Sequence, residues 1–233
     1  MGVAGPNEKY IEDTLKEFVR LCDDVIIATN NADDDTKKLI KKYGFWQYED
    51  NREWGLYQPD IKTDLLRRAG KLRPDWIIAL DMDEKFAPEF TRAEAERLTA
   101  QKEIAFYFLV VNLYNDKDHF VHGQGIQRFW NIRFFKYLSD NTVYQKKSLH
   151  CGLAPPIYYY KGWHAPFYLE HYGLMDKKDR DRKAERYAKY DPTGKFKSKV
   201  YYDDLVKTLT PRVFNRERLL EQLRNSAETK PRK

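Results

Sequence analysis

A short apolar run that ends abruptly in acidic residues constrains the fold of this chain more than any other feature. Residues 76–80 (Trp-Ile-Ile-Ala-Leu) have the length and composition of a buried strand, and Asp81, Asp83 and Glu84 follow with no spacer. Because side chains alternate along a strand, Asp81 and Asp83 are expected to point to the same face. Two such carboxylates repel each other unless a cation lies between them, so the pattern predicts a site for Mg²⁺ or Mn²⁺. A plain acidic turn is the alternative.

A second polar cluster follows an apolar run near the start of the chain. Residues 25–28 (Val-Ile-Ile-Ala) read as a buried strand, and a polar turn occupies 29–35. Helices are expected at 8–22, from this turn to residue 43, and at 60–69. This order predicts parallel strand pairing in a layered α/β fold. Ligands lie outside the carboxyl ends of strands in such sheets, so 29–35 and 81–84 are expected at one edge.

The remaining segments give a coarser prediction. Thr91 and Glu94 have the spacing of a capping box, which predicts a helix there. Strands are expected at 104–114 and 129–138, irregular structure at 151–172 because of its Gly, Pro and aromatic content, and helices at 176–190 and 215–225.

Composition bounds the class of protein. The chain has 233 residues, which suits one large α/β domain or two small ones, and its 42% hydrophobic and 33% charged residues exclude wholesale disorder. No apolar run approaches the ~20 residues of a membrane span, and no signal peptide is recognised. Cys22 and Cys151 are too few for a zinc site or a disulfide framework, so a reducing, cytoplasmic setting is expected. The net charge of +6 is dispersed and selects no partner by itself.

Several segments together resemble a known family in the order in which they occur. The strongest is 75–84, which closely resembles the D-W-I-x-x-L-D-x-D-E segment of family 2 glycosyltransferases of the GT-A fold. Residues 7–11 resemble the family's N-E-x-x-I/L opening, and 24–36 resemble its second strand and D-x-S-x-D-x-T loop. Weaker similarities follow at 133–135, 149–150, 170–173 and 182–192.

The resemblance implies a fold and a domain division. It implies a mixed, mostly parallel sheet flanked by helices, with a Rossmann-like nucleotide-binding half, over residues 1–192. Residues 193–233 would then form a helical extension with a basic tail. Two departures stand out: the family usually has an acid where Thr29 stands, and only Met1–Gly5 are left for its first strand.

The resemblance also implies a reaction, the inverting transfer of a sugar from a nucleotide sugar to an acceptor hydroxyl. It implies that Asp81 faces the nucleotide ribose and the metal, that Asp83 binds the metal directly, and that Glu84 supports the acidic loop. It places Thr29, Asn30 and Asn31 near the nucleotide base. His171 is a candidate ligand of the metal or the diphosphate. Lys62 and Arg133 are candidate cations for the donor diphosphate. A carboxylate base would deprotonate the acceptor, with Glu170 named first and Asp116 and Asp118 as alternatives.

The identity of the substrates is left open by the sequence. The donor is expected to be a UDP- or GDP-sugar and the acceptor a glycan, a lipid-linked molecule or a protein. The basic tail, Lys230–Lys233, leaves peripheral contact with an anionic membrane as a further alternative. No nucleic-acid partner is expected, because 33–35 and 81–84 would make the ligand edge acidic. Three competing classes are a nucleotidyltransferase, a nucleic-acid-binding module and a catalytically silent relative that only binds sugars or partners.

Overall fold

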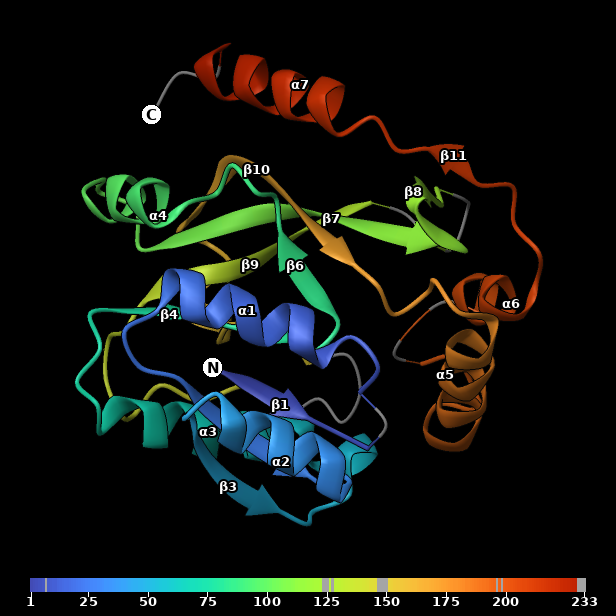
Figure 1. Cartoon of the computed structure of the whole chain (residues 1–233), viewed down its shortest axis with the longest axis horizontal. Helices are drawn as coiled ribbons and strands as arrows, with labels where there is room; N and C mark the ends of the chain where they lie inside the picture. The colour runs from blue at the N-terminus through green and yellow to red at the C-terminus, as the bar shows by residue number, and fades with distance from the viewer. Residues whose placement is uncertain are drawn as a thin grey trace. The chain divides into compact units, whose positions relative to one another are not determined.

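A computed structural model describes residues 1–6, 8–122, 126, 128–145, 151–195, 197 and 199–229. These residues form two compact units, one of residues 1–107 with 132–163 and the other of 108–131 with 164–233. We call them unit 1 and unit 2, and Figure 1 shows the elements of both. The expectations for Asn7, 149–150 and the tail Lys230–Lys233 fall outside the described residues. In the described part of the chain, no helix has the length and apolar character needed to cross a membrane.

Unit 1 is built on a parallel sheet of four short strands. Its order is β3 (Trp46–Asp50), β2 (Ile26–Asn30), β1 (Gly2–Ala4), β5 (Leu80–Asp81). The register pairs Ala4 with Thr29, Val3 with Asp81 and Asn30 with Asp50. The short first strand therefore occupies the centre of the sheet in spite of its three residues. The predicted α/β fold with a mostly parallel sheet flanked by helices is confirmed.

The helices of unit 1 form where the sequence supplies an apolar face, and two of them also have a side-chain cap. They are α1 (Ile11–Leu21), α2 (Asp34–Lys42), α3 (Trp54–Gly70) and α4 (Arg92–Thr99). Asp33 caps α2 by accepting a hydrogen bond from the Thr36 N–H, and Thr91 caps α4 as its spacing predicted. In Figure 1, α1 lies above β1, and α2 and α3 lie below it in this view.

Helix α3 begins six residues earlier than the sequence predicted. The sequence predicted a start at residue 60, directly after Pro59, which is a poor residue for a helix interior. The structure has a kink at Tyr57, whose φ of −112° and ψ of 17° are not helical. Pro59 therefore lies near the start of the regular part of the helix, where its missing N–H costs little.

The apolar run 76–80 is not one strand, as expected, but two. β4 (Trp76–Ile78) pairs antiparallel with β9 (Phe129–Lys136), and β5 pairs parallel with β1. The change of partner occurs at Ala79, whose N–H donates to the carbonyl of Arg133 at 2.9 Å. β6 (Glu84–Phe86) follows after the acidic turn.

Unit 2 contains a mainly antiparallel sheet and the last three helices. Its strands run in the order β11 (Arg212–Val213), β8 (Asp116–Phe120), β7 (Ala105–Tyr114), β10 (Gly162–His171), where β7 and β10 each begin in unit 1. The helices are α5 (Lys177–Tyr190), α6 (Lys199–Val206) and α7 (Arg216–Thr229), and α5 and α6 pack side by side (Figure 1). Both strands and both helices predicted between residues 104 and 225 are present.

The expectation of irregular structure throughout 151–172 was wrong. Its second half forms β10, and only its first half, with the short 3₁₀ helix η1 (Pro156–Tyr158), is irregular. Aromatic side chains such as Phe167 and Tyr168 are buried in this strand. They fit a pleated, half-buried surface, and this preference outweighs Pro166 in the strand.

Candidate functional site

The carboxyl edge of the parallel sheet brings the two polar clusters together. Thr29 of β2 pairs with Ala4 of β1, and Asp81 of β5 pairs with Val3 of β1. Both clusters therefore leave the sheet at the same edge, from the two strands that flank β1. This placement was predicted from the strand order alone, and the register confirms it. Open α/β sheets bind their ligands at such an edge.

The polar residues that end β2 are tied to the neighbouring strand. The Thr29 hydroxyl donates to the carbonyl of Tyr48 at 3.1 Å. The Asn30 amide donates to the carbonyls of Asp50 and Arg52, at 2.7 and 2.8 Å. Asn31 is exposed and has a positive φ of 50°. Thr29 and Asn30 thus stabilise the edge, while Asn31 presents its side chain to solvent there; contact of the three with a nucleotide base stays a prediction.

The acidic segment is held from within by a buried ion pair. Glu84 and Arg133 have only 1% and 2% of their side chains exposed, and two guanidinium nitrogens donate to the carboxylate at 2.5 and 2.7 Å. Glu84 also accepts a hydrogen bond from the backbone N–H of Asp81 at 3.1 Å. The geometry therefore makes Glu84 and Arg133 the support of the turn that carries Asp81 and Asp83, both half-buried. A contact of Arg133 with a diphosphate stays a prediction.

Lys62 is buried beneath this edge rather than solvated on α3. Its ammonium donates to the carbonyls of Cys151 and Gly152, at 2.7 and 3.3 Å, and lies 5.5 Å from the ring centre of Trp54. Burial lowers the pKa of Lys62, and the negative charge of Asp81 opposes that shift. Lys62 is thus a buried cation within electrostatic range of Asp81.

His171, in unit 2, has an ordered imidazole. Nδ1 lies 2.7 Å from the Asn112 amide oxygen, and Nε2 lies 3.4 Å from the ammonium of Lys183. A ring that donates from Nδ1 to an amide oxygen keeps its lone pair on Nε2, which is the arrangement of many metal-binding histidines. The role of His171 toward metal or diphosphate stays a prediction, because the carboxylates Asp81 and Asp83 belong to the other unit.

Glu170 is buried in a network of its own in unit 2. Its two oxygens accept hydrogen bonds from Arg216 at 2.7 Å and from the Tyr172 hydroxyl at 3.1 Å. Asp118 lies 3.3 Å from the same arginine, and Asp116 contacts His119 at 2.8 Å. The hydrogen bonds from His119 hold the pKa of Asp116 below its usual range. Which of the three carboxylates acts as a base stays a prediction.

The donor chemistry at the acidic edge fits a hard divalent cation. Among the described residues no group of three or more His, Cys, Asp or Glu side chains is placed to hold a metal. Mg²⁺ and Mn²⁺ do not require such a group, since they bind through one or two carboxylates and complete their shell with water and phosphate oxygens. Asp81 and Asp83 would supply those carboxylates.

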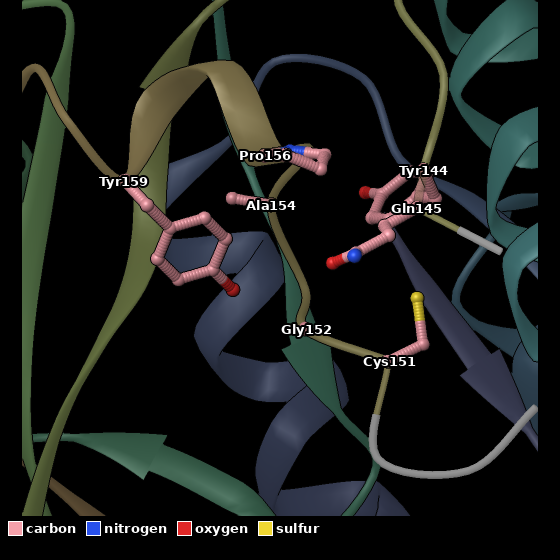
Figure 2. A pocket seen from close by; sticks show the side chains of 7 residues that line it. All are labelled: Tyr144, Gln145, Cys151, Gly152, Ala154, Pro156 and Tyr159. Atoms are coloured by element: carbon pink, nitrogen blue, oxygen red, sulfur yellow. The ribbon is translucent and has the colours of Figure 1, made fainter. Parts of the chain in front are cut away.

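A small pocket in unit 1 was not predicted from the sequence. Seven residues line it: Tyr144, Gln145, Cys151, Gly152, Ala154, Pro156 and Tyr159. Figure 2 shows the Gln145 amide and the Cys151 thiol on one side and the ring of Tyr159 on the other. A Cβ atom on Gly152 would lie 1.9 Å from the Tyr159 hydroxyl, so any larger residue would displace the phenol from this position. The sequence signal was the density of Gly, Pro and Tyr between 151 and 160, which we interpreted only as irregular structure.

Comparison with known proteins assigns no family. No family model matches the chain, and no curated protein matches it. The chain is similar to the crystal structure of residues 1–349 of S. aureus TarS, with a TM-score of 0.46 and 11% identity over 88% of this chain and 68% of that one. It covers 42% of the longer TarS chain. Another TarS structure, similar to the same degree, is a complex with UDP.

Two further solved structures are less similar. HddC from Yersinia pseudotuberculosis has a TM-score of 0.41 and 9% identity over 80% of this chain and 97% of that one. CTP:phosphocholine cytidylyltransferase from Streptococcus pneumoniae has a TM-score of 0.32 and 13% identity over 97% and 96%. At such values these likenesses assign neither a family nor an activity to this chain.

Proposed function

We propose that this chain is a metal-dependent glycosyltransferase of the GT-A type that transfers a sugar from a nucleotide sugar to an acceptor hydroxyl. One observation carries the proposal: Asp81 and the segment Thr29–Asn31 leave the two parallel strands that flank β1, at the same sheet edge. The resemblance of 75–84 to the D-x-D-E segment of family 2 glycosyltransferases is the reason for assigning a metal and a nucleotide sugar to this edge.

The role that we propose for each residue follows from the chemistry of its side chain. Asp81 and Asp83 would hold Mg²⁺ or Mn²⁺, which supplies neutralising charge for the diphosphate when bound. Glu84 and Arg133 fix the turn through their buried pair. A carboxylate base, with Glu170, Asp116 and Asp118 as candidates, would take the proton of the acceptor hydroxyl, which then displaces the nucleoside diphosphate with inversion.

The nucleotidyltransferase alternative is disfavoured by the end of β1. That class needs backbone N–H groups in a glycine-rich basic loop to bind phosphates. Here the N–H of Gly5 donates to the carboxylate of Glu8 at 2.9 Å. A carboxylate at that position repels an anion instead of recruiting one.

Calorimetric titration tests the proposal. UDP, GDP and their sugar conjugates are titrated into the full chain with and without Mn²⁺, and then into Asp83→Ala. We expect binding that depends on Mn²⁺ and is lost in Asp83→Ala, while the control Glu96→Ala, which removes a 65% exposed carboxylate on α4, binds normally. Folded protein that binds no nucleotide under any condition would contradict the proposal. Metal-dependent binding without turnover or donor hydrolysis would instead identify a catalytically silent relative.

A further inference from the structure

The pocket beside Cys151 has the size of one six-membered ring. Its volume is about 150 Å³. Apolar cavities of this size accept benzene, whereas sites for whole drug-sized ligands span roughly 300–1,000 Å³. The pocket therefore accommodates a single ring of a larger ligand and not a nucleotide.

The lining suits an uncharged ring with hydroxyl groups. The Tyr159 phenol, the Gln145 amide and the Cys151 thiol offer polar atoms, whereas Ala154 and Pro156 offer apolar contact. None of the seven lining residues carries a charged side chain. A sugar ring combines C–H faces with hydroxyl groups and matches this mixture.

One wall of the pocket is fixed by hydrogen bonds to its backbone. Lys62 donates to the carbonyls of Cys151 and Gly152. The Cys151 N–H donates to the Gln58 side chain at 3.2 Å, and the Tyr144 hydroxyl donates to the carbonyl of Leu153 at 2.8 Å. Because these partners hold the wall in place, the pocket is formed before any ligand arrives.

The pocket lies within electrostatic range of the acidic edge. Burial lowers the pKa of Lys62, which donates to the wall of the pocket, and the negative charge of Asp81 opposes that shift. Burial raises the pKa of Tyr144 well above its usual value, and Asp81 adds to that shift. Burial also raises the pKa of Tyr159, and the charge of Arg133 opposes it. The geometry agrees, because Tyr144 and Ala154 of the pocket pack in the same buried cluster as Ala28 and Ala79, which lie within two residues of Thr29 and Asp81. A ring in this pocket would thus lie in the same part of unit 1 as a diphosphate bound at Asp81 and Asp83.

We propose that this pocket takes the uncharged sugar ring of the donor and that Gln145, Tyr159 and Cys151 select which sugar is transferred. This inference rests on the proposed function. It adds a class of sugar, a neutral monosaccharide unit, and a set of residues that the sequence did not indicate.

The thiol of Cys151 provides a direct readout of pocket occupancy. The wild-type chain is alkylated with iodoacetamide, and the labelling rates of Cys151 and Cys22 are followed by peptide mass spectrometry. We expect a neutral-hexose nucleotide sugar with Mn²⁺ to slow labelling at Cys151 about fivefold or more, whereas the matching nucleoside diphosphate leaves the rate unchanged. Cys22 is an internal control, because burial raises the pKa of its thiol and it lies outside the pocket. Equal protection by both ligands, or none by either when both bind, would overturn the inference.

Two pocket variants test selectivity separately. Gln145→Ala and Tyr159→Phe should each weaken nucleotide-sugar binding roughly threefold to tenfold, the effect of about one hydrogen bond, and leave nucleoside diphosphate binding unchanged. The control Tyr160→Phe alters a neighbouring side chain that is 93% exposed and should change neither affinity. Equal losses for both ligands, or no loss for either, would contradict the assignment.

The failure of the proposed function can be recognised independently. If calorimetry detects no nucleotide binding, Cys151 labelling is repeated with free neutral monosaccharides at high concentration. If the monosaccharide slows labelling at Cys151 but not at Cys22, the pocket binds a sugar ring although the protein is not a nucleotide-sugar transferase. Absence of protection would overturn the pocket assignment as well.

Discussion

At the scale of single residues, the buried pair of Glu84 and Arg133 is the feature on which the candidate site depends most. Taking two charges out of water is costly, and their attraction offsets this cost only when every polar atom is satisfied. Here Glu84 receives two guanidinium N–H groups and the N–H of Asp81. The pair thus links the core of unit 1 to the backbone of the proposed metal ligand.

Removing one partner of this pair should destabilise the protein severely. We expect Arg133→Met to lower the free energy of unfolding by about 3–5 kcal/mol, because Glu84 would be left charged and buried. The double variant Glu84→Leu/Arg133→Met should be clearly more stable than the single one. As a control, Arg92→Met breaks the exposed pair with Asp23 and should cost less than about 1 kcal/mol. Urea unfolding measures all three, and a loss below about 1 kcal/mol in Arg133→Met would contradict this account.

The sequence could reveal these residues but not their partners. Asp81, Asp83 and Glu84 were recognised because they follow an apolar run directly, which is a local signal. The pairing of Glu84 with Arg133 spans 49 positions, and no spacing rule predicts it. Lys62 was recognised only as a candidate cation for the diphosphate, since nothing local indicates that its ammonium is buried against two carbonyls.

At the scale of elements, the end of β3 is stabilised by a charge network at the ligand edge. Arg52 donates to both oxygens of Asp50 and also to Asp64. The guanidinium of Arg52 holds the pKa of Asp50 below its usual range. Asn30 donates to the carbonyls of Asp50 and Arg52, so this network and the end of β2 support each other.

This network should make stability depend on pH in the acid range. A carboxylate with a lowered pKa in the folded state contributes stability above about pH 4, and that contribution is lost as the pH falls through the folded pKa. We therefore expect Asp50→Asn to cost about 1–3 kcal/mol near neutral pH and the difference from wild type to vanish toward about pH 2. Urea unfolding at several pH values measures this. A difference of constant size at every pH would refute the role of the charge, and Asp35→Asn, at an exposed position, serves as control.

Element boundaries show where sequence reasoning reached its limit. The apolar runs and caps predicted α1, α2 and α4 because those signals act within a few residues. The start of α3 was missed because a proline inside a helix usually interrupts it. Here the kink at Tyr57 allows Pro59 to lie within the helix. β10 was missed because its pairing with β7 lies about fifty residues away in the chain, and this contact outweighs the Gly and Pro around it.

At the scale of the whole molecule, several described residues beyond 192 form hydrogen bonds with the strands of unit 2. The Phe214 N–H donates to the carbonyl of Asp118 at 2.7 Å, which pairs β11 with β8. Arg216 binds the buried Glu170, and the Leu209 N–H donates to the hydroxyl of Tyr114 at 3.1 Å. The sequence predicted a helix near 215–225 but not these contacts, since they join segments 40 or more positions apart.

A chain that ends at residue 192 should therefore fold poorly in unit 2. Its Glu170 would remain buried without Arg216, and β8 would lose the strand that covers its edge. We expect amide hydrogens of β7 and β8 to exchange at least about tenfold faster, because losing roughly 1.4 kcal/mol or more of local stability produces that change. A chain that ends at residue 229 retains every contact named here and should match the full chain. If the 1–192 chain instead keeps the exchange protection of the full protein, the predicted domain boundary at 192 holds, and residues 193–233 are a dispensable extension.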